Sequence, residues 1–487
     1  MKLILAASPA ILALSQLLAL MPVLAAGPVT FELQHTVQVC NHAGHLATWC
    51  DSTDLAASAE ATGLEQKISQ QLDRAMANPT MSRVYAAEFS FSDSVIQKKM
   101  CDLGKAGVAV EIFVDAGSSK DISFADAAAI DASGAASATE KACQKDAAHP
   151  NLKTIVLGGF TAFPQWRLHH NKTVIVDAGD GTPFNIDFSS GNLSKYGTSL
   201  HMDNWVMMTA TPQSNISRAS LCLFEGLNAA AKSAADTGMY ANGGLDWSKD
   251  PIVMAAYQDA RQACYTANNV IPMNDPEAAI AAEGIAPFFT PNPGKQAFQA
   301  LQNQIQSVIN QQDQAASYIY IAIEHFTSQR IADLLSKAAD KGVDVRIIMN
   351  AGTATGNSEG AATDKKIYDF FKTAKVKFRF IETNEDTIVD APGASPGDHV
   401  AVAQQMHNKF ALLNGKRVFS GAGHYTGSGL DGNFESLYLT QDATLSREYG
   451  QYFKQLWDES ADAAYLTDHT PLTTPEAYAP SFLQLVQ

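Results

Sequence analysis

The sequence predicts an α/β fold built from two similar lobes, and two observations support this. Helix-like and strand-like segments alternate through both halves of the 487-residue chain. The segment that begins at Gly107 returns at Gly342, an offset of 235, and the segment around His170 returns around His407, an offset of 237. The repeat therefore spans the chain with almost no net insertion. Its period is far too long for a solenoid, so it indicates duplication of one domain.

The first 26 residues have the features of a secretory signal peptide. Met1-Lys2 leads into an apolar run from Leu3 to Leu24, with small residues near its end. An uncleaved membrane anchor is the alternative, which the serines and prolines inside the run disfavour. We expect the mature protein to be secreted or periplasmic, with residues 27–60 as a short N-terminal extension.

The next segments predict a first lobe over residues 61–272. Apolar residues at Leu64, Ile68 and Leu72 follow a helical period, and the predicted helix ends near residue 78. A strand at 84–91, a helix at about 92–105 and a strand at 107–117 follow. Gly107 lies between the last two, where glycine commonly ends a helix.

The same series predicts a second lobe over residues 285–487. Its segments are a helix at 298–309, a strand at 318–323, a helix at 328–341 and a strand from 342 to 352. Proline and glycine cluster at 274–294, which indicates a boundary between the lobes. Residues 353–400 are polar and rich in turn formers, so they predict loops that either cover a cleft or vary freely on the surface. A helix is expected at 448–457.

The cysteines fit an exported protein. All six lie in the first half, and an even number in a secreted chain favours disulfides. We expect sequential pairing, 40–50, 101–143 and 222–264. The chain has no C-x2-C pair, so a structural zinc site is not expected.

The charge balance is acidic and bears on partners. The chain has 34 basic and 50 acidic residues, a formal net charge of −16, and no run rich in lysine or arginine. Binding a long polyanion requires many basic contacts, so nucleic acid is a less favoured partner. Strong attraction to anionic membranes is disfavoured too, although transient surface contact is compatible. A monomer is the default expectation, and no cofactor is expected.

One motif occurs twice and points to the chemistry. Leu168-His169-His170-Asn171-Lys172 and Met406-His407-Asn408-Lys409 are each followed by an apolar, strand-like run. Side chains two residues apart share a face of a strand, so each copy presents one imidazole and one ammonium. Two histidines and two lysines supply what metal-free cleavage of a phosphodiester needs: a nucleophile, an acid for the leaving oxygen, and cations for the phosphate.

The pattern H-x-K-x4-D with a downstream G-S-x-N resembles the phospholipase D superfamily of phosphodiesterases, from about residue 64 to 440. The resemblance implies two lobes, each a mixed β-sheet flanked by helices, related by an internal pseudo-twofold with the site between them. It implies catalytic roles for His170, Lys172, His407 and Lys409, and a phosphohistidine intermediate. Asp203 and Glu435 are the implied acids that orient the histidines, each serving either its own lobe's histidine or the other's.

Further motif positions are partly altered. Ser189-Ser190-Gly191-Asn192 stands where the family has G-S-x-N, so Ser190 and Asn192 are expected to bind the phosphate. In the second half, His424 replaces the asparagine and is expected to contact substrate, while Ala422 replaces the serine. Asn414 stands where the motif has aspartate. Its counterpart Asp177 lies seven residues from His170, on the opposite face of a regular strand, so both are interpreted as structural.

These observations predict an exported enzyme that hydrolyses glycerophospholipids, with His170 as nucleophile and His407 as acid and base, an assignment that can be reversed. A nuclease of the same superfamily and a non-catalytic binding protein are the alternatives. A metal site is not expected, because no HExxH-type spacing occurs and lysine is a poor ligand. His169, His201 and His325 are interpreted as ordinary histidines. Glu88 and Glu324 close the matched strands and either line the pocket or, as is favoured, are solvated strand ends.

Overall fold

The computed structural model describes residues 29–35, 63–115, 151–159, 167–194, 197–198, 201–240, 246–350, 361–381, 387–390, 399–402 and 406–462. The expected signal peptide lies outside these residues, as do most of the expected loops between 353 and 400. Among the described helices, none has the length and apolar character that crossing a membrane requires.

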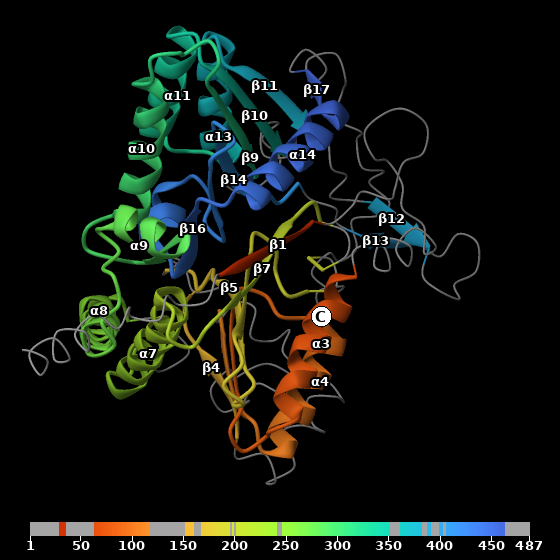
Figure 1. The fold of residues 1–487 in the computed structure, drawn as a ribbon, viewed down its shortest axis with the longest axis vertical. Coiled ribbons are helices and arrows are strands. Elements are labelled where there is room, and N and C mark those ends of the chain that lie inside the picture. Colours follow the sequence, from red (N-terminus) through yellow and green to blue (C-terminus); the bar gives the residue numbers. More distant parts are fainter. Residues whose placement is uncertain are drawn as a thin grey trace, which may run out of the picture.

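The described residues form two lobes, each organised around a mixed β-sheet (Figure 1). The first sheet has the order β1-β7-β6-β5-β2-β3-β4. Its strands are β1 (Thr30–His35), β2 (Arg83–Glu88), β3 (Ala109–Val114), β4 (Leu152–Val156), β5 (Lys172–Asp177), β6 (Phe184–Ser189) and β7 (Asn204–Ala210). β1 lies within the range expected for the N-terminal extension, yet it pairs antiparallel with β7 and is the edge strand of this sheet.

The second sheet repeats this topology. Its order, read from the equivalent edge, is β8-β16-β15-β14-β9-β10-β11-β17. Its strands are β8 (Ile285–Thr290), β9 (Tyr318–Ile323), β10 (Asp344–Asn350), β11 (Lys377–Ile381), β14 (Lys409–Leu413), β15 (Arg417–Gly421), β16 (Glu435–Thr440) and β17 (Ala461–Asp462). Each strand of the first sheet thus has a counterpart, and β17 is an addition. β12 (Thr387–Asp390) and β13 (His399–Val402) form a separate hairpin. The predicted α/β fold of two similar lobes is confirmed.

Helices cover the outer faces of both sheets. In the first lobe these are α3 (Leu64–Met76) and α4 (Ser94–Ala106), and in the second α10 (Gln296–Ile309), α11 (Gln329–Asp340) and α13 (Ala361–Lys372). Each group buries its apolar stripe in its own lobe's core. Gly107 and Gly342 end the matched helices α4 and α11 with φ of 104° and 95°, which glycine adopts without strain.

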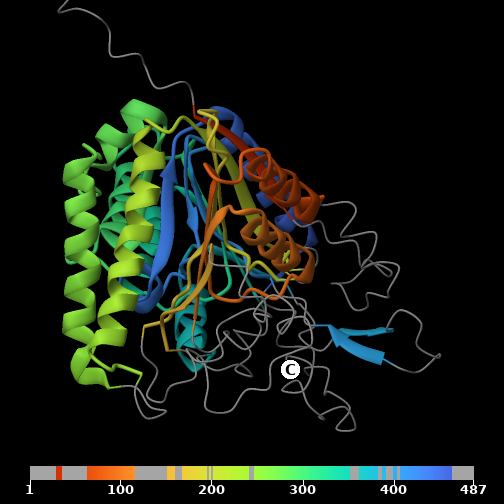
Figure 2. The ribbon, with the colours of Figure 1, turned by 90° about the horizontal axis from the view of Figure 1, so that it is seen from below.

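A third core joins the lobes. It contains apolar side chains from both sheets and from α7 (Asn215–Asp236), α8 (Asp250–Ala267) and α14 (Ala443–Glu459). α7 and α8 pack against one another on one side of the sheets, opposite α3 and α4 (Figure 2). α9 (Pro276–Glu283) then leads directly into β8. Because one apolar core serves both halves, the sheets are held in a fixed relation to each other.

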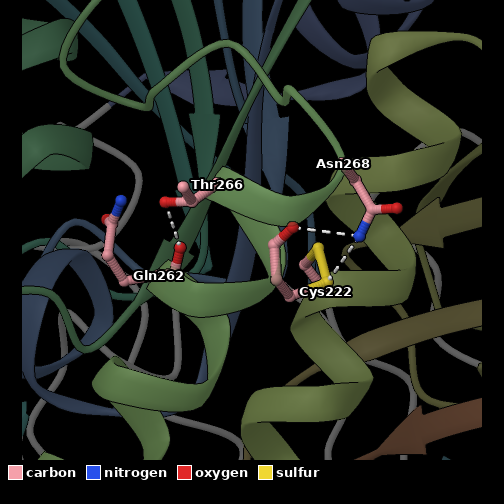
Figure 3. The surroundings of a disulfide bond; sticks show 5 residues. Cys222, Gln262, Thr266 and Asn268 are labelled. Carbon is pink, nitrogen blue, oxygen red and sulfur yellow. Dashed lines mark hydrogen bonds between the residues drawn. A yellow bond between two sulfur atoms is a disulfide. The ribbon is translucent and has the colours of Figure 1, made fainter.

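A disulfide joins two of these helices. Cys222 of α7 is bonded to Cys264 of α8, which confirms one of the three expected pairs. The end of α8 is closed by side chains beside this bond, where Asn268 donates to the carbonyl of Cys264 over 2.9 Å (Figure 3). The other two expected pairs include Cys40, Cys50 and Cys143, which lie outside the described residues.

Candidate active site

Both His-Asn-Lys motifs lie at the entrance to a central strand of their sheet. Lys172 is the first residue of β5 and Lys409 is the first residue of β14, so each histidine comes just before its strand. Both lysines are fully buried, and each histidine is 5% exposed. Lys172 Nζ donates to the carbonyl of His170 over 3.2 Å, and Lys409 Nζ to that of His407 over 2.8 Å. Each ammonium is thus fixed beside its own motif's histidine.

Each histidine is held by a carboxylate of the other lobe. His170 Nδ1 lies 2.9 Å from Glu435 Oε2, and His407 Nδ1 lies 2.9 Å from Asp203 Oδ1. Both carboxylates are fully buried. The sequence left open which acid serves which histidine, and the structure places them crosswise. Since Nδ1 is bound in both rings, Nε2 is the atom that each ring presents to a substrate.

Hydrogen bonds of the backbone and of the asparagine side chains also connect each motif to the other lobe. The N–H of His170 donates to the carbonyl of Phe434 over 2.9 Å, and the N–H of His407 donates to that of Met202 over 3.1 Å. Next to them, Asn204 Nδ2 donates to Asn408 Oδ1 over 3.0 Å. The matching contact runs from the hydroxyl of Ser436 to the side chain of Asn171. The middle residue of each motif therefore ties its strand to the other lobe.

The rings of His170 and His407 both lie near the ring of His424. The centroid of His424 lies 5.2 Å from that of His170 and 6.1 Å from that of His407. His424, which is expected to contact the substrate, thus lies near the histidines of both motifs.

Ser190 and Ala422, which stand at the serine position of the two motifs, differ in whether they can donate a hydrogen bond to the nearby carboxylate. Ser190 Oγ donates to Asp203 Oδ1 over 2.7 Å, so Ser190 orients the acid. In the second lobe Ala422 lacks this hydroxyl, and Asn433 Nδ2 donates to Glu435 Oε1 over 3.2 Å instead. The altered second motif therefore keeps a donor on its carboxylate. The side-chain oxygen of Asn192 is buried and makes no hydrogen bond to the described residues.

Glu324 lies inside the site, and its interpretation as a solvated strand end is wrong. Its side chain is buried, and Oε2 lies 3.3 Å from Lys409 Nζ, 3.3 Å from His407 Nε2 and 3.7 Å from His424 Nε2. Glu88 is also fully buried, where it accepts a hydrogen bond from the N–H of Leu193 over 3.2 Å. The sequence could have pointed to Glu324, because it directly follows a predicted strand that leads toward the motif.

Burial sets the protonation of the first lobe's groups. Burial, then Lys172 and Lys409, hold the pKa of His170 well below its usual value, so its imidazole is neutral. Burial also raises the pKa of Glu435 to about 8 and, with the neighbouring Lys409, lowers that of Lys172 to about 7. Near neutral pH His170 is therefore neutral, and Glu435 ionises at a higher pH than an exposed carboxyl does.

The second lobe differs because of Glu324. Burial acts to raise the pKa of Glu324, but His407 and Lys409 outweigh it and lower the value to about 2. Burial holds the pKa of His407 well below its usual value, although the Glu324 carboxylate opposes that shift. His407 thus has an anion beside its Nε2, which favours its protonated form relative to His170.

The two residues that close the motifs lie at the ends of their strands, Asp177 as the last residue of β5 and Asn414 in the turn after β14. Asp177 Oδ1 accepts from the N–H of Gly179 over 2.9 Å. Asn414 has φ of 52°, and its Oδ1 accepts from the N–H of Tyr318 over 2.6 Å. An asparagine tolerates this left-handed conformation better than most residues. Neither side chain contacts the histidines in the described structure.

The remaining histidines have distinct surroundings. His169 is fully buried, and burial lowers its pKa to about 3. His201 lies with its ring 5.8 Å from that of His407, and His325 Nδ1 lies 3.0 Å from Asp364 Oδ2. Two groups bring possible metal ligands together among the described residues: Glu324, His407 and His424, and His201, Asp203 and His407. The interpretation of His201 and His325 as ordinary residues overlooked their closeness to the site.

Known proteins match parts of this architecture. Residues 308–457 match the family described as cardiolipin synthase, PLD-like domain. The mitochondrial cardiolipin hydrolase of Chlamydomonas reinhardtii is 27% identical over 138 residues, which cover 28% of this chain and 50% of that protein. The enzyme of the same name from Danio rerio is 34% identical over 71 residues, 15% of this chain and 31% of that protein. The chain thus spans about half the length or less of these curated relatives.

A solved structure matches nearly the whole fold. The phosphatidylserine synthase of Haemophilus influenzae superposes with a TM-score of 0.51 at 11% identity, over 85% of this chain and 90% of that one. This likeness concerns the fold, which extends over both lobes. Residues 308–457 are thus similar to the PLD-like family, and the fold of both lobes is similar to that of the phosphatidylserine synthase.

Proposed function

We propose that the protein is an exported, metal-independent phosphodiesterase that hydrolyses glycerophospholipids through a phosphohistidine. The observation that carries the proposal is the pair of crossed contacts, in which a buried carboxylate of each lobe lies 2.9 Å from the histidine of the other. A carboxylate on Nδ1 fixes the tautomer and supports the imidazolium that forms when Nε2 reacts. Two such rings around a shared pocket suit a two-step transfer through one phosphorus.

We assign the nucleophile to His170. With Glu435 ionised and accepting the Nδ1 proton, the neutral ring presents a lone pair at Nε2, and the ring beside it is that of Phe89, with centroids 5.0 Å apart. An apolar neighbour leaves the lone pair available and admits an anionic phosphate. His407 instead has Glu324 3.3 Å from Nε2, a partner that favours a proton on that atom. His407 is therefore the acid.

The reaction then proceeds in two displacements. His170 Nε2 forms a bond to phosphorus as the bond to the headgroup oxygen breaks, and His407 gives that oxygen its Nε2 proton. A water molecule next attacks the phosphohistidine, loses a proton to His407 and releases His170. The ammonium groups of Lys172 and Lys409 balance the charge on the non-bridging oxygens. An anionic phosphate between them raises the pKa of both lysines and so keeps them protonated.

The lipid substrate is supported by the relatives and by the charge. The two curated relatives above are cardiolipin hydrolases by name. The net charge of −16 disfavours a long polyanion such as DNA. Export is supported by the apolar run between Leu3 and Leu24.

The test is an assay of purified protein on vesicles of phosphatidylcholine, phosphatidylethanolamine and cardiolipin, and on DNA, all with EDTA. We expect headgroup release from lipid that persists in EDTA and is lost in His170→Ala. Asp177→Asn is the matched control, because Asp177 lies at the far end of β5 from His170 and accepts from the N–H of Gly179. Cleavage of DNA without lipid turnover would support the nuclease alternative, and loss of all hydrolysis in EDTA would contradict the metal-independent mechanism.

A further inference from the structure

Three side chains of the site also have the chemistry of metal ligands, a role that the reaction just described does not use. Glu324, His407 and His424 bring one oxygen and two nitrogens within 4.8 Å of one another. Glu324 Oε2 lies 3.3 Å from His407 Nε2 and 3.7 Å from His424 Nε2. With zinc bonds of about 2.0–2.1 Å, neighbouring ligand atoms of a tetrahedral site lie about 3.3 Å apart. The distance from Glu324 to His407 equals this spacing, and the distance from Glu324 to His424 exceeds it by a few tenths of an ångström.

The chemistry of the donors also fits zinc. Two imidazoles and one carboxylate form a common ligand set for Zn²⁺, whereas Mg²⁺ and Ca²⁺ prefer oxygen. His407 Nδ1 is bound to Asp203, an arrangement that orients a zinc-bound histidine and strengthens it as a ligand. His424 Nδ1 is buried and has no hydrogen-bond partner among the described residues, so no contact prevents Nε2 from offering its lone pair.

The second possible cluster is less suited. It contains His201, Asp203 and the same His407. Asp203 Oδ1 is already engaged by His407 Nδ1 and by the hydroxyl of Ser190. A metal there would compete with both of these contacts, whereas the first cluster leaves them in place. The geometry therefore favours Glu324, His407 and His424.

We propose that Glu324, His407 and His424 bind one Zn²⁺ ion, and that this ion inhibits the enzyme. Zinc on His407 Nε2 occupies the atom that would carry the catalytic proton, and it takes the place of substrate between the histidines. Lys409 Nζ lies 3.3 Å from Glu324 Oε2 and repels the ion, so binding is weaker than at a structural zinc site. The inhibition rests on the proposed function, but the binding does not.

The test separates these two claims. Metal-free full-length protein is titrated with ZnCl2 by isothermal titration calorimetry, with MgCl2 as the comparison ion. We expect a zinc-binding event that His424→Asn and Glu324→Gln each weaken by at least about 10-fold, the effect expected of a lost ligand. The matched control is His201→Asn, which removes the histidine of the other cluster and is expected to change affinity by less than about 3-fold on that basis.

Two outcomes overturn the zinc site, and a third overturns only the inhibition. Unchanged zinc binding in both His424→Asn and Glu324→Gln, or loss in His201→Asn alone, places the ion elsewhere and contradicts the proposal. Circular dichroism and thermal unfolding show whether each variant is folded, and using two ligand variants keeps the test valid if one is not. Where zinc binds as expected but hydrolysis of lipid vesicles is equally fast with zinc and with EDTA, the inhibitory role is wrong. If no lipid is hydrolysed under any condition, the calorimetry still decides the binding claim.

Discussion

Glu324 occupies in the second lobe the position that Phe89 occupies in the first. The N–H of Phe89 donates to the carbonyl of Asn171 over 3.0 Å, and the N–H of Glu324 donates to that of Asn408 over 3.2 Å. This difference gives the two histidines unlike surroundings. An apolar ring adjoins His170, and a carboxylate adjoins His407. The difference supports the proposal that the nucleophile is His170 and the acid is His407.

Replacing Glu324 tests this assignment through the leaving group. In Glu324→Gln, His407 loses the anion that favours its proton, so protonation of a poor leaving group suffers. We expect hydrolysis of a phospholipid to fall about 10-fold or more, within the range that general acid catalysis contributes. A p-nitrophenyl phosphodiester needs little acid and is expected to react at a nearly unchanged rate. Equal losses on both substrates would contradict the assignment.

The crossed carboxylates predict a large effect on turnover. Glu435→Gln and Asp203→Asn keep the shape of each side chain but remove the charge that supports the opposite histidine. We expect kcat to fall by about 10²–10⁴-fold with a smaller change in KM, as when the acid of a catalytic histidine is replaced by its amide. Steady-state kinetics on lipid vesicles measure this. A change in KM alone would mean that these residues act in binding.

A buried carboxyl outside the site predicts how stability depends on pH. Burial raises the pKa of Asp187 to about 7, and one of its oxygens has no hydrogen-bond partner among the described residues. The folded protein keeps this proton up to about pH 7, whereas an unfolded chain releases it near pH 4. Folding therefore binds a proton between these values, and stability falls as pH rises from 4 to 7.

The variant Asp187→Asn removes this dependence. We expect its Tm to exceed that of the unmodified protein at pH 8 and to lose the advantage at pH 4.5. Gln71 donates to Asp187 Oδ1 over 3.1 Å, and an asparagine keeps this acceptor. Asp259→Asn on exposed α8 is the control and should leave the difference between the two pH values unchanged. A lower Tm for Asp187→Asn at both pH values would contradict the prediction.

The disulfide between α7 and α8 predicts a loss of stability on removal. Cys222 and Cys264 are 42 residues apart, and closing a loop of that length stabilises a fold by about 4 kcal/mol in the chain-entropy treatment. We expect Cys222→Ala/Cys264→Ala to lower the Tm by several degrees, measured by calorimetry. Because α7 and α8 pack beside the core that joins the lobes, activity should fail at a lower temperature as well. An unchanged Tm would mean that helix packing alone holds this side of the molecule.

The sequence was sufficient for the lobes and the motifs because those signals are local and repeated. Alternation of apolar residues placed β9 at Tyr318–Ile323 as the structure has it, and matched glycines placed the ends of α4 and α11. The crossing of Asp203 and Glu435 could not be predicted, since no local pattern encodes which lobe a carboxylate faces. Glu324 was misjudged for a related reason: burial at the end of a strand depends on the facing lobe. The edge strand β1 pairs with a strand more than 160 residues away, which periodicity does not reveal.

The identity of the phosphorylated residue tests the central claim most directly. The protein is mixed with a p-nitrophenyl phosphodiester, quenched in alkali within one turnover, digested and mapped by mass spectrometry. The account predicts an alkali-stable phosphoramidate on His170, increased in amount in His407→Ala, where the second displacement lacks its base. A phosphoryl group on His407, or turnover without any phosphohistidine, would contradict it.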